Sequence, residues 1–287
     1  MIAKGSDGAY GERTGPVLSL PFGWVLDAHD SLSSTNATAR DHVLAGTARE
    51  GLIVWAGEQT GGRGRRGRVW HSPKGNLYHS YLFRSGSAPA VNAQLSFVGA
   101  IALSEAIEAL CAFADPRCKW PNDIVCHGGK VSGMLLEQVE NPQGGAPWVV
   151  LGIGVNVTTA PITGALFPAL ALADLGCGMT VEGLLEAIAR SVSKWVGKWR
   201  TDGFTPIRDA WLARALGVGR PIEARLSETV TLSGIFEGLD GDGHLCLLEP
   251  DGRRRLISAG DVFFPGLEEP GLEGSDLDPL PGKGPVS

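Results

Sequence analysis

The chain lacks a surplus of basic residues and any long apolar run. Its 287 residues include 25 lysines and arginines against 31 aspartates and glutamates, a net charge of −6. A general nucleic-acid or membrane-surface binder would carry a basic surplus. No run approaches the roughly 18 to 20 apolar residues that span a bilayer, and residues 1–16 lack the apolar core of a signal peptide. The sequence therefore indicates a cytoplasmic protein that binds neither nucleic acid nor membranes.

Cysteine pairs and metal-ligand spacings are also missing. The five cysteines are odd in number and no two are spaced C-x-x-C, so the sequence signals neither a disulfide framework nor a zinc site. The histidines are scattered, and His71, His79 and His127 have no metal-ligand spacing. We expect free thiols, a reducing compartment and no metal site made by a cluster of side chains.

Two nucleotide-binding fingerprints are absent. Nothing matches the P-loop pattern G-x-x-x-x-G-K-[ST], and no glycine-rich turn is followed by an acidic residue at the Rossmann distance. If ATP is a substrate, the chain binds it in another way.

The hydrophobic pattern predicts two domains, with a change of character after Gly217. Before that point, expected strands at 22–26, 51–56, 76–83 and 148–157 alternate with expected helices at 34–44, 93–113, 181–200 and 205–216. From Pro221 to Phe264, four or five short β-rich runs punctuated by Gly and Asp predict a small barrel. We expect a flexible segment at 1–21, a first domain at 22–217, the barrel at 218–265 and a disordered tail at 266–287.

Residues 61–70 (GGRGRRGRVW), here called the arginine loop, concentrate positive charge in an acidic protein. Four arginines fall within residues 63–68, which costs free energy unless an anion or acidic partner relieves it. The glycines let the backbone take positive φ and approach a ligand, and their N–H groups can form an anion-binding concavity. Arginine suits phosphate or carboxylate, and Trp70 offers an aromatic face for a base. A solvated basic loop and an RNA-contacting arm stay open as alternatives.

Residues 119–137 (KWPNDIVCHGGKVSGMLLE) form a second charged segment, predicted as a hairpin within 119–139. With a turn at 128–129, Lys119, Asp123 and Lys130 share one face. Lys130 and Asp123 would then lie roughly 13 Å apart, too far for an ion pair and suited to two ends of an elongated ligand. Gly133 inside the second strand is typical of close approach by a ligand or another backbone. The alternative is a Lys–Asp pair that braces a surface hairpin.

The order of these motifs resembles that of biotin protein ligases. They are STN at 34–36, Gln59 before GRGRRGRVW, KWPND at 119–123, KVSG at 130–133 and GIGVN at 152–156, with a small β module after them. GRGRRG followed by KWPND is highly specific, and the resemblance covers about residues 22–265. It implies an α+β fold, with a mixed-sheet catalytic domain of the biotin/lipoate ligase type and a small C-terminal SH3-like β-barrel.

The resemblance implies an ATP-dependent ligase. In that reaction the carboxylate of biotin attacks the α-phosphate of ATP, giving biotinyl-5′-AMP and pyrophosphate. A lysine of a biotin carboxyl carrier domain then attacks the mixed anhydride. Because the first step brings two anions together, it requires fixed positive charge and Mg²⁺.

The resemblance also assigns roles to individual residues. The implied catalytic residues are Arg65, Lys119, Asp123 and Lys130. The implied biotin-binding residues are Ser34, Thr35, Asn36, Gln59, Arg63, Gly64, Arg65, Lys130 and Gly133. The implied nucleotide-binding residues are Arg65, Arg66, Trp70, Asn122, Lys130 and Asn156. Trp70 would stack on adenine, and Asp123 would orient or neutralise the attacking lysine.

Two other interpretations fit less well. A lipoate ligase or octanoyltransferase shares the fold but lacks a GRGRRG loop of this kind. An RNA-binding module would interleave basic and aromatic residues on the barrel strands, whereas the barrel carries Asp240, Asp242, Glu249 and Asp251.

About 30 residues precede the STN motif, too few for a helix-turn-helix, so we expect a ligase without a DNA-binding domain. Pairing through a sheet edge would give a homodimer.

Overall fold

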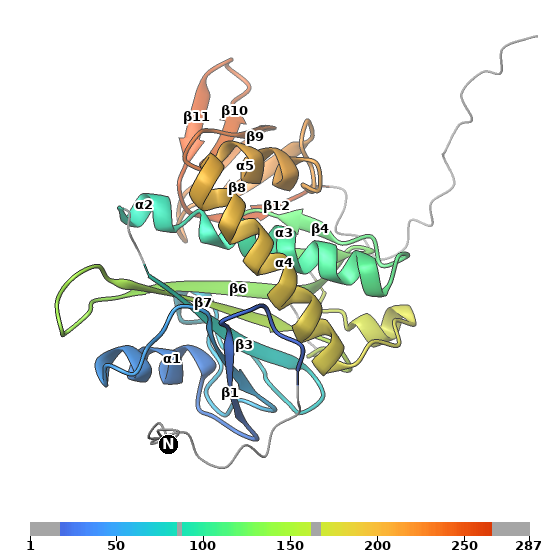
Figure 1. Cartoon of the computed structure of the whole chain (residues 1–287). Coiled ribbons are helices and arrows are strands. Elements are labelled where there is room, and N and C mark those ends of the chain that lie inside the picture. The colour runs from blue at the N-terminus through green and yellow to red at the C-terminus, as the bar shows by residue number, and fades with distance from the viewer. Residues whose placement is uncertain (1–17, 85–87, 162–167, 266–287) are drawn as a thin grey trace, which may run out of the picture.

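Two β-sheets organise the described residues, 18–84, 88–161 and 168–265, of this computed structural model (Figure 1). The first sheet has the strand order β1-β2-β3-β7-β6-β5-β4, and only its β1–β2 pair is parallel. Its strands are β1 (Val25–His29), β2 (Leu52–Ala56), β3 (Leu77–Arg84), β4 (Arg117–Lys119), β5 (Asp123–Cys126), β6 (Gly129–Val139) and β7 (Trp148–Val155). A mixed sheet of this kind confirms the fold predicted for the first domain.

The second sheet is antiparallel and has the order β11-β10-β9-β8-β12. Its strands are β8 (Pro221–Arg225), β9 (Thr231–Leu239), β10 (Leu245–Leu248), β11 (Arg254–Ile257) and β12 (Asp261–Phe263). The predicted small β module is therefore present. The expected tail at 266–287, and residues 1–17 of the expected N-terminal segment, lie outside the described residues.

Helices cover both faces of the first sheet. Helix α1 (Thr35–Leu44) packs on one face, α3 (Leu95–Leu110) on the other, and α4 (Val181–Asp202) packs on α3 (Figure 1). The remaining helical segments are α2 (Pro89–Asn92), α5 (Thr205–Leu212) and the 3₁₀ turns η1 (Arg65–Gly67) and η2 (Leu172–Leu175). Because side chains alternate along a strand, β2 is buried throughout, with Leu52 and Val54 in the core under α1 and Ile53 in the larger core under α3.

The segment Pro89–Leu110 is long and apolar enough to cross a membrane by length and composition. The sequence predicts a helix here, at 93–113, but no continuous apolar run of spanning length, because polar residues interrupt the segment. In the folded chain 72% of the most apolar 18-residue stretch of this segment is buried. Its longer part, α3, belongs to the larger core and packs against the first sheet.

Cys111 and Cys177 form a disulfide, so the expectation of five free thiols is wrong. Their Cα atoms lie 5.6 Å apart and the two residues are 66 positions apart in the chain. The bond ties the end of α3 to the segment that precedes α4. An odd number of cysteines without short spacings carries no sign of such a distant pair.

Reducing this disulfide is expected to lower the free energy of unfolding by about 2–4 kcal/mol, because the bond restricts a 66-residue loop in the unfolded chain. Burial raises the pKa of Cys118 and of Cys126 to about 12, which keeps both thiols unreactive. Alkylation followed by mass spectrometry should therefore modify Cys246 alone in the folded chain. It should modify three cysteines after denaturation and five after reduction. Five modified cysteines in the denatured, unreduced chain would contradict the bond.

His79 on β3 is fully buried, and neither ring nitrogen has a hydrogen-bond partner among the described residues. Burial lowers the pKa of His79 to about 3, against about 6.5 in an unfolded chain. Below pH 6.5 the unfolded state therefore binds a proton that the folded state does not, and stability falls as the pH falls. Between pH 7 and pH 5 this should remove about 2 kcal/mol. Urea unfolding of His79→Phe should lack that loss, and parallel pH curves for both proteins would contradict it.

Candidate functional site

A pocket opens where side chains on the α1 face of the first sheet become small. On β7, Trp148 and Val150 fill the core under α1, whereas the next two positions on that face are Gly152 and Gly154. On the neighbouring strand Gly133 pairs directly with Gly154. A pocket of about 380 Å³ lies over these glycines. The missing side chains thus create both the space and a flat floor.

The indole of Trp70 lies on this glycine floor. A Cβ added to Gly154 would come within 2.5 Å of Trp70 Nε1, and one added to Gly133 within 3.2 Å of Trp70 Cζ3. Lys130 Nζ stands 5.5 Å from the centre of the indole ring, within the range of a cation–π contact. The position of the ring therefore depends on residues that have no side chain.

The N-terminus of α1 forms the polar end of the pocket. Thr35 N donates to Gln59 Oε1 at 2.8 Å, and Asn36 Nδ2 donates to Glu137 Oε2 at 2.6 Å. Ser80 Oγ lies 2.7 Å from both Thr35 Oγ1 and Asn36 Oδ1. These buried amides and hydroxyls are held in fixed directions, so they can recognise the donors and acceptors of a small uncharged group.

The other side of the pocket is cationic. Arg63, Arg65, Arg68 and Lys130 line it, and Asp123 is the one carboxylate among its described lining residues. Arg65 Nη1 donates to Asn122 Oδ1 at 3.1 Å, and burial lowers the pKa of the Arg65 guanidinium. A half-buried cation that faces an amide rather than a carboxylate is stabilised when an anion binds beside it. The pocket therefore suits an anionic ligand with an uncharged polar end.

Lys130 and Asp123 form an ion pair, with Nζ 2.7 Å from Oδ1. The predicted separation of roughly 13 Å is wrong because the strand register differs. The predicted hairpin is present as β5 and β6, but its turn lies at 127–128 instead of 128–129, and Lys119 ends a further strand, β4, that pairs with β5. Asp123 pairs with Gly133, and the register shifts between Ile124 and Val125. This irregularity brings the two charged side chains together at the pocket, where a count from a regular turn separates them.

The structure gathers most of the predicted site residues around this one pocket. Those that line it are Ser34, Thr35, Asn36, Gln59, Arg63, Gly64, Arg65, Trp70, Asn122, Asp123, Lys130, Gly133 and Asn156. Arg66 and Lys119 are not among the lining residues. Arg66 donates to Leu226 O of the second sheet, and Lys119 is buried with its Nζ 5.7 Å from the Phe263 ring centre.

Sequence reasoning missed Gly152, Leu135 and Arg68, which also line the pocket. Gly152 had a usable signal, since two glycines at alternate positions of a predicted strand fall on one face. Leu135 has no sequence signal that separates it from a core leucine. Arg68 is one of four arginines within residues 63–68, and nothing in the sequence distinguishes it from the others. Only the fold decides which of these arginines turn inward.

Asn156 closes the far side of the pocket. It is buried, and its Nδ2 donates to Leu170 O at 3.3 Å. Its Oδ1 is buried without a hydrogen-bond partner among the described residues. A bound ligand with a donor group would satisfy this acceptor.

The sequence predicts no cluster of metal-ligating side chains. Within the described ranges, the turn after β9 brings ligand atoms of Asp240, Asp242 and His244 within 4.8 Å of one another. The group is held by its own contacts, since Asp240 Oδ1 accepts from the backbone N of Asp242 and of His244, and Asp240 Oδ2 pairs with His244 Nδ1 at 2.9 Å. It lies outside the pocket described above.

The fold and this pocket define a ligase-type domain with a separate C-terminal β module. Residues 28–156 match the Biotin/lipoate A/B protein ligase family and residues 217–264 match the Biotin protein ligase C terminal domain. A biotin–[acetyl-CoA-carboxylase] ligase of Paracoccus denitrificans is 42% identical over 239 residues, which cover 81% of this chain and 98% of that protein. The chain belongs to the biotin protein ligase family.

Two further matches are a longer relative and a solved structure with bound ligands. The bifunctional ligase/repressor of Bacillus subtilis is 36% identical over 249 residues, which cover 83% of this chain and 74% of that protein. The biotin protein ligase from Aquifex aeolicus, solved in complex with biotin and ATP, has a TM-score of 0.71 and 26% identity. That likeness covers 83% of this chain and 97% of the Aquifex chain.

Proposed function

We propose that this chain activates biotin as biotinyl-5′-AMP and transfers it to a lysine of a biotin carboxyl carrier domain. One observation carries the proposal most directly: a single pocket joins a rigid polar end, a glycine floor under an indole and a cationic wall. An acyl-adenylate has the matching parts, an acyl head, an anionic centre and an aromatic base. The 42% identical relative is a biotin–[acetyl-CoA-carboxylase] ligase.

The polar end suits the ureido head of biotin. Its carbonyl oxygen accepts hydrogen bonds and its two N–H groups donate them, so it needs fixed donors and acceptors in one plane. Ser34, Thr35 and Asn36 offer them from the start of α1, and Gln59 braces Thr35 from the neighbouring segment. Arg63, Gly64 and Gly133 border the valeryl chain of biotin in this assignment.

The cationic wall suits the reacting carboxylate and phosphate. Lys130 and Arg65 would face both anions, since they line the pocket from opposite segments. Fixed positive charge lowers the barrier by stabilising negative charge that develops on the phosphate in the transition state. Asp123, paired with Lys130 at 2.7 Å, would orient or neutralise the attacking carrier lysine. Trp70, Asn122 and Asn156 would hold the nucleotide.

Mg²⁺ would enter with the nucleotide. The described lining residues offer one carboxylate, Asp123, and Mg²⁺ in nucleotide sites is held largely by phosphate oxygens and water. This donor set fits an ion shared with ATP. When bound, Mg²⁺ supplies neutralisation of phosphate charge.

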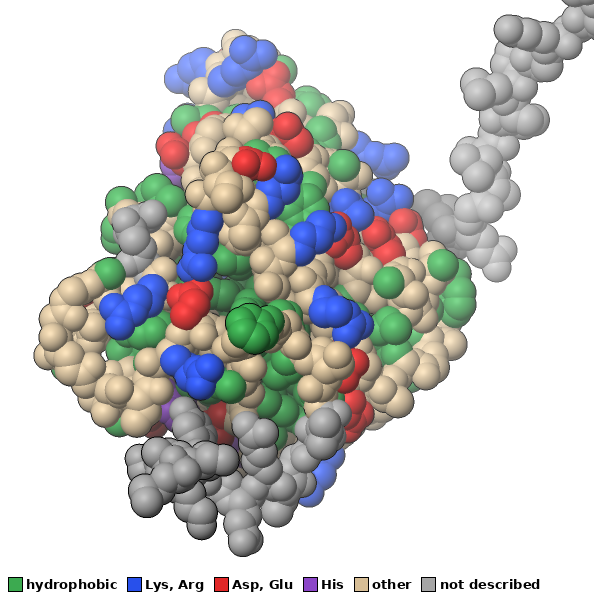
Figure 2. Space-filling view, viewed as in Figure 1, with side chains coloured by type: hydrophobic (Ala, Val, Ile, Leu, Met, Phe, Trp, Pro, Cys, Tyr) green, Lys and Arg blue, Asp and Glu red, His purple; other side chains and the backbone are tan. Residues whose placement is uncertain are grey.

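We propose that the reaction takes place in the cytoplasm and involves neither nucleic acid nor a membrane. We also propose that two copies of the chain can form a homodimer by pairing through a sheet edge. Figure 2 shows basic and acidic side chains interspersed on the face it displays, including the part over the second sheet. The net charge of −6 agrees with this mixture. A nucleic-acid-binding surface would need a continuous basic area.

Exchange of labelled pyrophosphate into ATP tests the proposal. The purified protein with Mg²⁺ should catalyse exchange when biotin is added and not when lipoate is added. Labelled biotin should then appear on a purified carrier domain and not on a carrier whose acceptor lysine is replaced by arginine. No exchange with biotin at high protein concentration would overturn the proposed function.

A further inference from the structure

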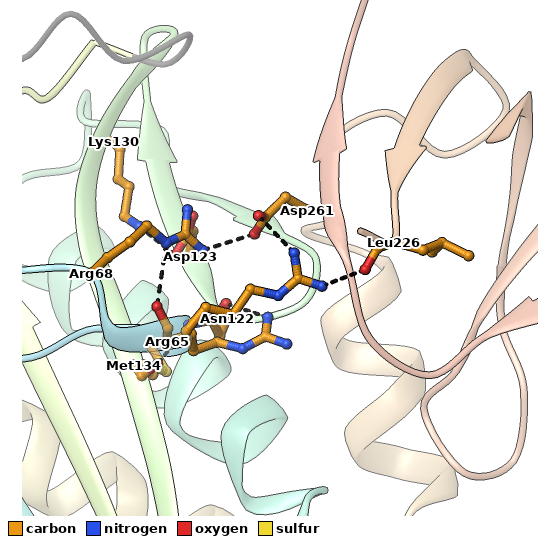
Figure 3. A network of polar contacts seen from close by, with 9 residues as sticks. Arg65, Arg68, Asn122, Asp123, Lys130, Met134, Leu226 and Asp261 are labelled. Atoms are coloured by element: carbon orange, nitrogen blue, oxygen red, sulfur yellow. Dashed lines mark hydrogen bonds and ion pairs between the residues drawn. The ribbon is translucent and has the colours of Figure 1, made fainter. Parts of the chain in front are cut away.

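One carboxylate of the second sheet anchors the arginine loop. Asp261 Oδ1 accepts a hydrogen bond from Arg68 Nη2 at 2.9 Å (Figure 3). Asp261 Oδ2 lies 3.5 Å from Arg66 Nη1. Arg66 Nη2 also donates to Leu226 O at 2.8 Å. These contacts join residues 160 to 195 positions apart in the chain. The conformation of the arginine loop therefore depends on the second sheet.

The backbone of the arginine loop needs such an anchor. Of its residues, Arg66 and Gly67 have positive φ, 55° and 72°. A residue other than glycine keeps this conformation only where its surroundings hold it. The glycines at 61, 62 and 64 do not take positive φ, contrary to expectation. A strained position at Arg66 thus coincides with the residue that the second sheet binds.

This anchoring directs neighbouring arginines to different places. The side chain of Arg68, which borders the pocket, extends toward Asp261, whereas Arg65 turns to Asn122 at the pocket (Figure 3). Arg66 Nη1 lies near Asp261 Oδ2, at 3.5 Å. Ion pairs of such exposed arginines add little to global stability. Their effect is on direction: with Arg66 and Arg68 held, Arg65 is left facing the site.

The strand that carries Asp261 is itself firmly placed. In β12, Asp261 pairs with Arg225 of β8. Two residues further on, the ring of Phe263 lies 4.7 Å from Arg225 Cζ and 5.7 Å from Lys119 Nζ. A strand of three residues thus contacts both the arginine loop and the start of the 119–137 segment.

We propose that Asp261 is a positioning residue that keeps the arginine loop closed over the pocket, so that the adenylate stays bound until the carrier lysine reaches it. The inference rests on the proposed function. Asp261 does not line the pocket, so it acts through Arg66 and Arg68. An acyl-adenylate is reactive toward water and other amines, and an ordered loop over it prevents both losses.

Two measurements on Asp261→Asn test this inference. In the first, biotinyl-5′-AMP is formed on the enzyme, free ligand is removed and release of the adenylate is followed; release should be about tenfold faster than from the parent. In the second, the ligand-free protein is exposed to trypsin, which should cut the arginine loop about tenfold faster. Asp261→Glu should restore both rates toward those of the parent.

A matched control separates loop anchoring from general damage to the second sheet. Glu237→Gln removes the 2.8 Å ion pair with Arg254, which lies within that sheet, and should leave both rates unchanged. In a double-mutant cycle, Arg66→Gln should add little to the release rate of Asp261→Asn, because both substitutions remove the same contact between the arginine loop and β12.

Three outcomes would overturn the inference: parental rates for Asp261→Asn, equal effects of Glu237→Gln, or additive effects in the cycle. If Asp261→Asn does not fold, Arg66→Gln alone should release the adenylate faster, because Arg66 contacts Asp261 and Leu226 O without lining the pocket. An unchanged rate would count against the anchor. Failure of the proposed function gives a different pattern, since the parent would then form no adenylate while the trypsin comparison would still report on the anchor.

Discussion

Replacing Lys130 by methionine is expected to lower the rate of biotin-dependent pyrophosphate exchange by about 10²–10³-fold, the usual cost of removing one preorganised electrostatic contact from an active site. Lys130 is the one lysine that lines the pocket among the described residues. Its ammonium is held between the carboxylate of Asp123, at 2.7 Å, and the ring of Trp70. Methionine keeps an unbranched apolar stem, one heavy atom shorter, and removes the ammonium with its charge and its hydrogen-bond donors. The two anions must then meet without it.

A surface lysine provides the control for this prediction. Lys194→Met removes an exposed ammonium that pairs with Glu105 on the helical side of the first sheet, and exchange should keep the parental rate. Circular dichroism and thermal unfolding should be alike for both variants. A Lys130→Met enzyme with exchange within threefold of the parent would show that this ammonium does not act on the reacting groups.

The amino-acid sequence predicts the parts of this fold that depend on local patterns. Apolar runs place β2, β3 and β7, and helical spacing places α3 and α4 within a few residues of the observed ends. The ordered motifs also identify most residues of the pocket. The N-terminus of α1 and Gln59 meet there although Thr35 and Gln59 are 24 positions apart in the chain. That meeting follows from the resemblance, since no periodicity predicts it.

Contacts between distant segments escape such patterns. The register shift at Ile124 is invisible to a count from a turn, because one extra residue in a strand moves every later pair. The Cys111–Cys177 bond and the Asp261–Arg68 pair join positions 66 and 193 apart. Each depends on where whole elements pack, so the residues themselves carry no local signal.

The glycines of β7 combine a local sequence pattern with contacts to distant segments. Their alternation is visible in the sequence, but its meaning comes from the side chains that occupy the space above them. A Cβ on Gly152 would come within 2.9 Å of Asn36 Cγ, and one on Gly154 within 2.8 Å of Trp70 Cε2. Neither glycine has a positive φ, so an alanine would cause no backbone strain. The two positions therefore test the two halves of the pocket separately.

Gly152→Ala is expected to lower kcat/KM for biotin by about 10²-fold while changing the KM for ATP little, because displacement of a positioning group by about 1 Å costs that much. The added methyl group pushes Asn36 away from Ser80 and Glu137, which hold it at the polar end. Gly154→Ala should have the reverse effect. It lifts the Trp70 indole from the glycine floor, so the loss should fall on ATP. Initial rates with each substrate varied in turn measure both.

Gly197→Ala is the matched control for both glycine variants. It adds the same methyl group to helix α4 at a position where nothing lies within 4 Å of the new Cβ, and both KM values should stay at the parental level. Equal losses for biotin and ATP in both pocket variants would mean that the floor acts as one unit. If Gly152→Ala impaired the use of ATP and Gly154→Ala that of biotin, biotin would lie against Trp70 and the nucleotide against α1. Opposite, selective losses require that biotin lies against α1 and the nucleotide against Trp70.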